Sequence, residues 1–534
     1  MIITAAMDVA GNEPWSLCRR STLMLALAVM VVLHNEVLVS GLEPVAGVKP
    51  HIVVVLVDDW GWANVGYHRE NATKEVQTPN FDSLCKRGIE LDQHYAYKFC
   101  SPSRSSFLSG RLPIHVNIEN DYPDYYNPND TVSGYAGIPR NMTGIAAKLK
   151  SAGYSTHHIG KWDAGMATPE HTPIGRGFDS TFGYFHHEND FFTERAGSCS
   201  YNGKKYRNIT DLWLNEGPAL GRNGTGYEEG MFKRHVLEVI RNHSIDSPLF
   251  IYYAAHIAHT PLEVTQKYLD EYSFIDNEVR RSYHAMIAYL DDVMGNITEA
   301  LVERGLWNNT LLLVSSDNGG PEYPGGGANN YPLRGGKLTS WQGGVRVNAF
   351  VSGGFIPSAM RGKKLEEYIA LADWYATFCS LAGVDPADER AKLAGLPPVD
   401  GLDMWPMLSG ANLTSPRTEI PLSPGLISGD YKILVGNNGQ AGWTGPQYPN
   451  STNPRGGIDA KVACGDDGCL FNIRTDPEER TNVAALQPAI LKQLQERLQA
   501  WDATAFNPDR GQQWPEACQT AIEKYGGYWG PFLP

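Results

Sequence analysis

The sequence predicts an α/β protein built on a large, mostly parallel sheet flanked by helices, with a smaller α+β domain at its C-terminal end. The first observation is a set of short apolar runs without alternation, which is typical of strands buried on both faces. These runs span residues 52–57, 249–253 and 311–314. The second is that helical patterns separate the runs. In residues 141–154, Thr143 is the expected N-cap and Gly153 the expected stop.

The composition changes after about residue 415, which predicts the second domain. Residues 430–439 and 469–484 have the pattern of strands joined by turns, and residues 488–501 have the pattern of an amphipathic helix. We therefore divide the chain into three expected parts. They are an N-terminal segment at 1–41, a main domain at 48–415 and a C-terminal domain at 416–534.

The N-terminal segment is typical of a secretory signal peptide. Arg19 and Arg20 precede the apolar run 22–33, which is shorter than the ~20 residues that a membrane span needs. An uncleaved signal anchor is the alternative. N-x-S/T sequons also favour the secretory pathway, with an extracellular or lysosomal location. Their asparagines are Asn71, Asn129, Asn141, Asn208, Asn223, Asn242, Asn296, Asn308, Asn412 and Asn450.

The eight cysteines fit an oxidising compartment. Cys18 lies in the signal segment and leaves an odd number, so one cysteine is expected to be free or chemically special. Cys464 and Cys469 have a spacing that suits a small disulfide loop or a zinc site. We predict the disulfide, because no second cysteine or histidine pair accompanies them.

The formal net charge of −14 argues against nucleic acid as a partner, because phosphate binding needs a basic face. No contact with a membrane is expected beyond the signal segment. An anionic substrate would need local basic residues to overcome the repulsion.

Polar residues follow the apolar runs at the point where each run ends. In open parallel sheets, ligands bind beyond the carboxyl ends of the strands, so these residues are expected to converge on one site. They are Asp58 and Asp59, Lys161 and Asp163, His256 and His259, and Asp317 and Asn318.

The acidic members of this set suggest a metal site. Asp58, Asp59, Asp317 and Asn318 offer hard oxygen donors, which suit Ca²⁺ or Mg²⁺ better than zinc. The alternative is a group of strand-end carboxylates that face solvent or cap helices. The matching Asp-Asn pair after a second strand favours the metal.

Residues 97–111, YKFCSPSRSSFLSGR, place Cys100 at the expected start of a helix, with Pro102 in the first turn. The free N–H groups of the helix and the nearby Arg104 favour an anion there, which suggests a thiolate nucleophile. However, a soft thiolate does not suit a neighbouring site of hard oxygen donors.

The segment Cys100–Arg104, followed by Leu108–Arg111, resembles the C-x-P-S-R signature of the type I sulfatases. Further blocks resemble that family in the same order, namely VDDWGWANVGY, GKWDAG, HTPL, SSDNGG and NNYPLRGGKLTSWQGGVR. The resemblance extends from about residue 50 to the end of the chain and is greatest to the arylsulfatase B-like branch. It implies the fold of alkaline phosphatase.

The resemblance also implies the chemistry. A formylglycine-generating enzyme would convert Cys100 to formylglycine (3-oxoalanine), an aldehyde that acts as its hydrate. One hydroxyl of the hydrate attacks sulfur and releases the alcohol, and the other expels sulfate and regenerates the aldehyde. The implied activity is that of a sulfuric ester hydrolase of the arylsulfatase type, acting on an aryl sulfate or a sulfated glycan.

Carried over by position, the resemblance assigns roles to single residues. It implies one divalent cation, Ca²⁺ in preference to Mg²⁺, with the ligands Asp58, Asp59, Cys100, Asp317 and Asn318. Arg104 would hold the hydrate, and Lys161 and Lys337 would bind sulfate oxygens. His259 would donate a proton to the leaving oxygen. His256 lies outside the family pattern and is expected to be structural.

Asp163 departs from the family pattern. The family usually has G-K-W-H here, and its histidine is the base that deprotonates the sulfated hydrate; this chain has GKWDAG. A carboxylate can accept a proton, so Asp163 is the expected general base. Its charge should weaken sulfate binding unless Lys161 compensates, and we expect an altered pH dependence rather than inactivity.

Two other functions stay open. One is a phosphate or phosphonate ester hydrolase of the same superfamily, and the other is an inactive relative that binds sulfated glycans. The second would predict loss of the metal ligands or the nucleophile, and this chain retains them. Aromatic loops at 120–130 and 442–449 are candidates for stacking on sugars, or else they pack the loops, and the stretch 183–192 is a possible pocket wall.

Overall fold

The computed structural model describes residues 47–69, 74–443 and 461–534. The expected signal peptide, 1–41, lies outside these residues, as do the sequons at Asn71 and Asn450. Within the described ranges, no helix is both long enough and apolar enough to cross a membrane.

A large mixed sheet forms the centre of the protein, and its middle five strands are parallel. In the described part of the chain it has ten strands. In spatial order they are β10 (Gly217–Pro218), β9 (Trp213–Leu214), β6 (Ser180–Tyr184), β5 (Ser155–Lys161), β11 (Leu249–Ala254), β1 (His51–Val57), β12 (Thr310–Ser316), β13 (Ala349–Ser352), β2 (Ile89–Leu91) and β14 (Lys363–Leu365).

The three apolar runs of the sequence are adjacent central strands. Val54 of β1 pairs with Tyr252 of β11 on one side and with Leu313 of β12 on the other. All residues of β1, β11 and β12 are buried, so both faces of each strand are covered. This confirms the α/β prediction, and it brings the carboxyl ends of the strands to one edge of the sheet.

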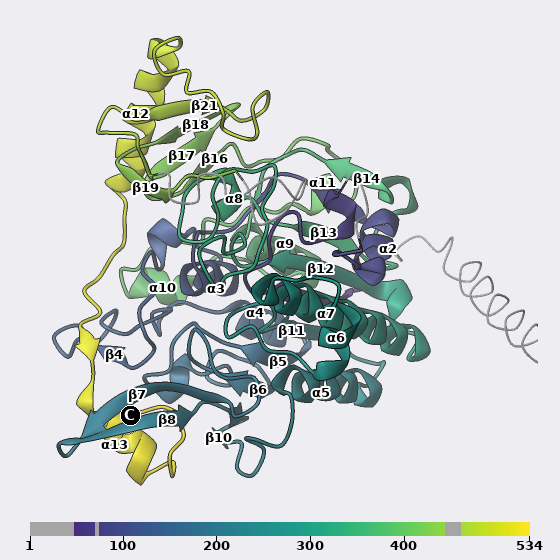
Figure 1. Ribbon diagram of the computed structural model, residues 1–534, viewed down its shortest axis with the longest axis vertical. Coiled ribbons are helices and arrows are strands. Elements are labelled where there is room, and N and C mark those ends of the chain that lie inside the picture. The colour runs from purple at the N-terminus through teal and green to yellow at the C-terminus, as the bar shows by residue number, and fades with distance from the viewer. Residues whose placement is uncertain (1–46, 70–73, 444–460) are drawn as a thin grey trace, which may run out of the picture. The chain divides into compact units, whose positions relative to one another are not determined.

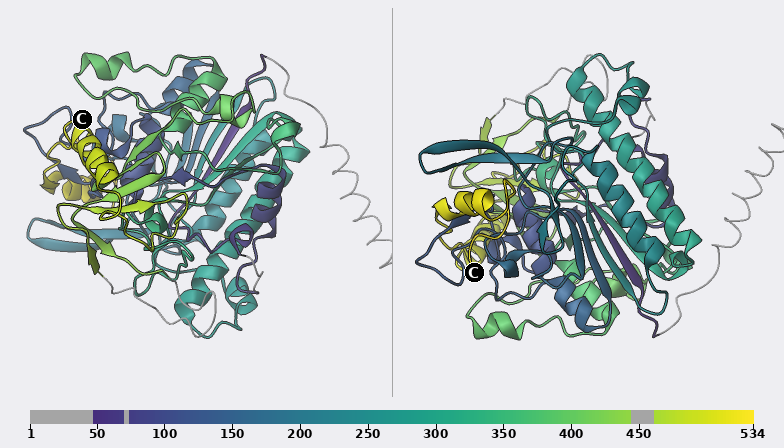
Figure 2. Two further views of the ribbon diagram at one scale, coloured as in Figure 1. Left: turned by 90° about the horizontal axis from the view of Figure 1, so that it is seen from above. Right: turned by 90° about the horizontal axis from the view of Figure 1, so that it is seen from below.

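Helices cover both faces of the sheet, as Figures 1 and 2 show. One layer contains α2, α5 and α7, where α7 packs against both of the others, and the opposite layer contains α3, α4 and α9. Their bounds are α2 (Pro79–Arg87), α5 (Glu228–Asn242), α7 (Glu278–Glu303), α3 (Cys100–Ser109), α4 (Ile145–Ser151) and α9 (Asp373–Ala382).

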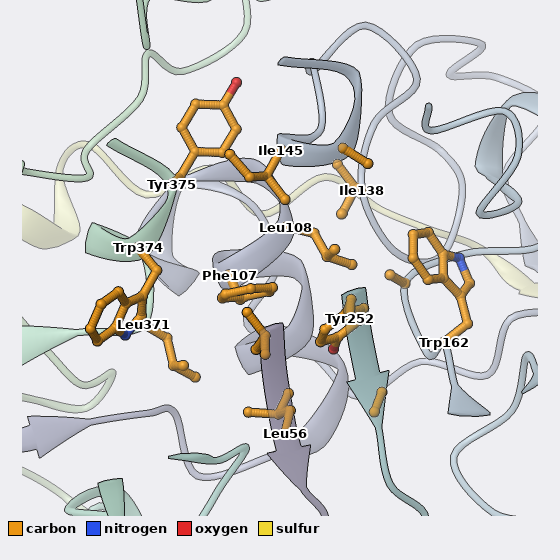
Figure 3. Packing of buried hydrophobic residues seen from close by; sticks show 14 of the residues in the cluster. Leu56, Phe107, Leu108, Ile138, Ile145, Trp162, Tyr252, Leu371, Trp374 and Tyr375 are labelled. Carbon is orange, nitrogen blue, oxygen red and sulfur yellow. The ribbon is translucent and has the colours of Figure 1, made fainter. Parts of the chain in front are cut away.

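Helix α3 is anchored to the sheet by Phe107. Its ring stacks on Tyr252 of β11 at a centroid distance of 5.2 Å and meets the edge of Phe378 from α9 at 6.3 Å. Figure 3 shows Phe107 within this cluster, together with Leu56 of β1 and Trp374 of α9. The packing fixes the position of the first residue of α3, which is Cys100.

Helix α4 differs from the prediction at its start. The N-cap is Gly144, and the side chain of Thr143 makes no capping bond. Instead, the backbone N–H and the hydroxyl of Thr143 both donate to the carboxylate of Asp388, at 2.7 Å each. A carboxylate far away in the sequence therefore takes the place of the predicted local cap. The helix ends at Ser151, just before the expected stop at Gly153.

The expected C-terminal domain contains a four-stranded antiparallel sheet, on which helix α12 (Pro488–Asp502) packs. Its strands are β16 (Glu419–Pro421), β17 (Gly425–Ser428), β18 (Tyr431–Leu434) and β21 (Cys469–Asn472). The contacts group the described residues from 47 to 534 into one compact unit, so the division at residue 415 stays a prediction.

The end of the chain returns to the main part of the protein. Strand β22 (Gln512–Gln513) pairs with β4 (Tyr125–Tyr126), and α13 (Pro515–Glu523) packs on the hairpin strand β7 (Arg195–Tyr201). A disulfide between Cys199 and Cys518 joins α13 to β7. Figure 1 shows the two elements side by side.

Of the remaining cysteines in the described residues, two form a disulfide and three are free. Cys464 and Cys469 form the predicted disulfide. In the described residues, Cys85, Cys100 and Cys379 are free and buried. Two buried structural thiols therefore accompany Cys100, and being unpaired does not by itself distinguish a reactive cysteine.

The asparagines of the sequons fit a glycoprotein. None of those with a described side chain is buried. Asn129, Asn242, Asn308 and Asn412 are exposed, and Asn141, Asn223 and Asn296 are half-buried.

We predict that Phe107→Ala lowers the free energy of unfolding by about 3–5 kcal/mol, because it removes a buried ring and leaves a cavity between α3 and the sheet. Urea unfolding followed by tryptophan fluorescence would measure the change. Leu393→Ala is the matched control, since Leu393 is 88% exposed and its loss should shift the free energy by less than about 0.5 kcal/mol. Equal midpoints for both variants would contradict this packing.

Candidate active site

The carboxyl ends of the central strands meet as predicted. Asp58 and Asp59 follow β1, Lys161 ends β5, and Asp317 follows β12. All four side chains are buried. Asp59 adopts a left-handed conformation, with φ of 59°, so the chain turns sharply where β1 ends.

Asp58 lies at the centre of the first group of contacts. Its Oδ2 accepts from Nζ of Lys161 at 2.6 Å and lies 3.5 Å from Nη2 of Arg104. Its Oδ1 accepts from Sγ of Cys100 at 3.5 Å. Arg104 also donates twice to Oδ2 of Asp317, at 2.8 and 3.0 Å. The first turn of α3 is therefore bound to the ends of β1 and β12.

Asp59 organises a second group on the other side. Its Oδ2 accepts from Nζ of Lys337 at 2.8 Å, and its Oδ1 accepts from Nδ2 of Asn318 at 2.7 Å. Lys337 also lies 2.9 Å from Nε2 of His259. Nδ1 of His259 donates to the carbonyl of Thr260 at 2.7 Å, so Nε2 is the ring nitrogen that accepts from Lys337.

Three carboxylates and three cations are thus buried together. Burial raises the pKa of Asp317, and the charge of Asp58 raises it further. Burial alone would lower the pKa of Lys161 and of Lys337, but the charges of Asp58 and Asp59 reverse this and raise both. Both ammonium groups consequently stay charged, as anion binding requires.

The predicted metal ligands fit a hard cation. One ligand atom from each of Asp58, Asp59 and Cys100, which are predicted ligands, and from His259, which is not, lies within 4.8 Å of the others. Among the described residues, Oδ1 of Asn318 is buried and has no hydrogen-bond partner, so this oxygen is available as a ligand. Asp317 lies beside the cluster, where its Oδ1 accepts from the backbone N–H of Asp59 at 3.3 Å.

Cys100 is the first residue of α3, as predicted. Its thiol is buried, and burial together with the charge of Asp58 raises the pKa of the thiol well above its ordinary value. A protonated thiol is a weak nucleophile and a poor ligand for a hard cation. The surroundings of Cys100 therefore do not favour an ordinary thiolate nucleophile.

Asp163 has a partner that the sequence did not indicate. Its Oδ1 accepts from Nδ1 of His187 at 2.9 Å, and its Oδ2 lies 3.8 Å from Nζ of Lys161. His187 follows β6, the parallel neighbour of β5. Sequence reasoning treated the stretch 183–192 only as a possible pocket wall. The position of His187 just after a strand next to β5 was the available clue.

His256 is buried, and its ring lies 6.0 Å from that of His259. Its Nδ1 is 3.0 Å from Oε2 of Glu228, and its ring stacks on Phe191 at a centroid distance of 3.9 Å. These contacts support the expected structural role.

Comparisons with known proteins show which family the chain belongs to. The family model for Sulfatase matches residues 50–384. Mouse (Mus musculus) arylsulfatase J is 33% identical over 515 residues, covering 91% of this chain and 80% of the relative. Mouse N-acetylgalactosamine-6-sulfatase is 29% identical over 375 residues, covering 69% and 68%.

Solved structures share the fold as well. The crystal structure of Ps i-CgsB in complex with k-i-k-neocarrahexaose matches with a TM-score of 0.69 and 25% identity, covering 90% of this chain and 98% of the other. The family match spans every strand of the large sheet, the Cys100 helix and every residue of the buried cluster. The chain therefore belongs to the sulfatase family and is a sulfuric ester hydrolase with the alkaline-phosphatase-like fold.

Proposed function

We propose that this protein hydrolyses a sulfate monoester through an aldehyde hydrate made from Cys100, with the help of one divalent cation. The observation that carries the proposal is the placement of Cys100. Its Sγ lies 3.5 Å from a carboxylate of the candidate metal site and within a group of three buried cations. Converted to formylglycine, the residue would present hydroxyl oxygens in place of a soft sulfur, which removes its conflict with the hard ligands.

The cation would be held by oxygen atoms at the ends of β1 and β12. Asp58, Asp59, Asp317 and the free Oδ1 of Asn318 are the proposed ligands, together with the converted Cys100. When bound, a divalent cation would supply positive charge to a sulfate oxygen and to the nucleophile. We infer Ca²⁺ in preference to Mg²⁺, which follows from the family resemblance.

The three buried cations would bind and orient the anionic groups. Arg104 reaches both Asp58 and Asp317, so it is fixed beside Cys100 and would hold the hydrate. Lys161 and Lys337 lie against Asp58 and Asp59 and would bind sulfate oxygens. Fixed donors in a site without water stabilise developing negative charge more strongly than mobile ones do.

His259 and Lys337 would supply the proton for the leaving alcohol. Burial and the charge of Lys337 hold the pKa of His259 well below its ordinary value, so the imidazole is neutral and accepts from the ammonium. The hydrogen-bonded proton between Nζ of Lys337 and Nε2 of His259 would therefore be the one that moves to the leaving oxygen as negative charge develops on it.

Asp163 would accept a proton in the step that releases sulfate. Its carboxylate lies between the cation of Lys161 and His187, which compensates for its charge beside an anionic substrate. Burial acts to raise the pKa of Asp163, but the charge and hydrogen bond of His187, together with the charges of Lys161 and Arg104, outweigh this, and the pKa is lowered. Asp163 is consequently ionised and can act as a base.

The natural substrate is proposed to be a sulfated glycan or an aryl sulfate. The N-acetylgalactosamine-6-sulfatase among its relatives and the carbohydrate complex among the solved structures support a glycan. Tyr122 is 53% exposed, and its ring lies 5.0 Å from that of His187, so it could stack on a sugar beside the site.

We further propose that the protein matures in the secretory pathway, where a formylglycine-generating enzyme acts on Cys100.

A phosphate or phosphonate ester hydrolase is the second candidate, since phosphate and sulfate have similar shapes. Turnover of a chromogenic aryl sulfate should exceed that of the matched aryl phosphate, and Cys100→Ala should abolish the sulfatase activity. Faster phosphate turnover would favour the second candidate. Failure to hydrolyse either ester when Cys100 is converted would favour an inactive glycan-binding relative.

We predict that removal of the metal abolishes activity and lowers stability, because it leaves buried carboxylates without their cation. After dialysis against EDTA, Ca²⁺ should restore both turnover and the thermal midpoint. Ca²⁺ at a free concentration of 100 times its Kd would add about 2.7 kcal/mol to the free energy of unfolding. Asn318→Ala should weaken this stabilisation, whereas the exposed Asn242→Ala should not. Full activity and an unchanged midpoint after EDTA would contradict a metal requirement.

We predict that Asp163→His moves the acid limb of the kcat–pH profile to higher pH. The pKa of Asp163 is lowered, so the wild-type base stays ionised well into acid, whereas a histidine has an ordinary pKa of about 6.5. Turnover of the aryl sulfate between acid and neutral pH would measure this. Superimposable profiles would show that residue 163 is not the base.

A further inference from the structure

A carboxylate–imidazole pair lies at the edge of the buried cluster. Nδ1 of His187 is 2.9 Å from Oδ1 of Asp163, and both side chains are largely buried. An ionised carboxylate can only accept, so Nδ1 carries the proton of this bond. The pair joins the loops that follow β5 and β6, which are parallel neighbours.

The two oxygens of Asp163 have different surroundings. Oδ1 is bound by His187. Among the described residues, Oδ2 is buried and has no hydrogen-bond partner, and it lies 3.8 Å from Nζ of Lys161. Lys161 in turn contacts Asp58, which accepts from Cys100. Oδ2 is therefore the oxygen on the side of the reacting groups, and it is free to accept a proton.

We propose that His187 is a positioning residue for Asp163: it holds Oδ1, fixes the orientation of the carboxylate, and leaves Oδ2 to accept the proton in the step that releases sulfate. This inference rests on the proposed function. In that step, the remaining hydroxyl of the Cys100 hydrate gives its proton to Oδ2. The O–H electrons form the aldehyde C=O, and the C–O bond to sulfate breaks with its electron pair leaving on the sulfate.

The backbone of Asp163 supports a specific placement. Its φ is 48°, in the left-handed region that is uncommon for residues other than glycine. Such a conformation persists where surrounding contacts hold it, and it is common at functional sites. The side chain of His187 provides one of these contacts, and burial of Asp163 leaves little room for another orientation.

Several charged and titratable groups face this pair. Lys161 and Arg104 favour the ionised carboxylate, as does His187 itself. The other neighbours are Asp121 and Tyr122 beside His187, and His186, Tyr184 and Tyr252 near Asp163. The pair therefore lies between two fixed cations on the catalytic side and an acidic, aromatic loop on the outer side.

The first test compares kcat–pH profiles of wild type and His187→Ala on a chromogenic aryl sulfate. Without His187, the largest contribution that lowers the pKa of Asp163 is lost while burial still acts to raise that pKa, so the acid limb should move to higher pH. We expect kcat to fall by roughly 10²-fold, within the range for general-base catalysis, with a smaller change in KM. Added imidazole should restore part of kcat, and His187→Gln should retain more activity than His187→Ala.

His186→Gln is the matched control. His186 is the adjacent histidine of the same loop, and its Nδ1 binds a different carboxylate, Oδ2 of Asp211, at 2.8 Å. Its substitution should leave the acid limb in place and should show no rescue by imidazole. An unchanged kcat–pH profile in His187→Ala, or equal shifts in both variants, would overturn the proposal.

A second readout does not depend on turnover. In Cys100→Ala protein labelled with ¹⁵N-histidine, the His187 signals can be assigned by their loss in the His187→Gln variant. Asp163→Asn should then shift the Nδ1 resonance of His187, whereas Asp211→Asn should shift that of His186. No change at His187 would show that the pair does not form.

The two hypotheses can fail separately. If wild type hydrolyses no sulfate ester, the proposed function fails, whereas a shift of the His187 Nδ1 resonance in Asp163→Asn would still support the contact.

Discussion

The burial of Asp58, Asp59 and Asp317 at one edge of the sheet is the constraint on which the rest of the site depends. Three buried carboxylates close together repel one another, so the surrounding protein must supply positive charge. Arg104, Lys161 and Lys337 do so from three separate segments, at 2.6–2.8 Å from the nearest carboxylate oxygen. In the described residues, Oδ1 of Asn318 has no hydrogen-bond partner, and ligand atoms of Asp58, Asp59, Cys100 and His259 lie within 4.8 Å of one another, which makes this arrangement a candidate metal site.

The fold determines which residues can take part. Parallel strands deliver Asp58, Asp317 and Lys161 to the same edge, and the packing of Phe107 on Tyr252 places Cys100 against them. Lys337 and His259 come from loops beyond this edge and close the site on the other side. The same neighbourhood accounts for the pair of Asp163 and His187, because β5 and β6 end side by side.

The sequence predicted much of this site because its residues directly follow apolar strands or lie in recognisable motif blocks. Asp58, Cys100 and Asp317 are of this kind. His187 was not predicted, because its bond to Asp163 links two separate loops and cannot be deduced from the spacing of residues within either loop. The cap at Thr143 was wrong for a related reason, as its partner Asp388 lies 245 residues away. The disulfide of Cys199 with Cys518 likewise could not be deduced from cysteine spacing.

The chemical state of Cys100 is the most direct test of the central claim. Protein secreted by a eukaryotic host should be digested with trypsin, and the peptide from Phe99 to Arg104 analysed by mass spectrometry. We expect this peptide to have lost sulfur and two hydrogens and gained one oxygen, in a preparation that hydrolyses an aryl sulfate. Cys85 and Cys379, also free and buried, should keep their thiols and serve as internal controls. An unmodified Cys100 in active protein would contradict the account.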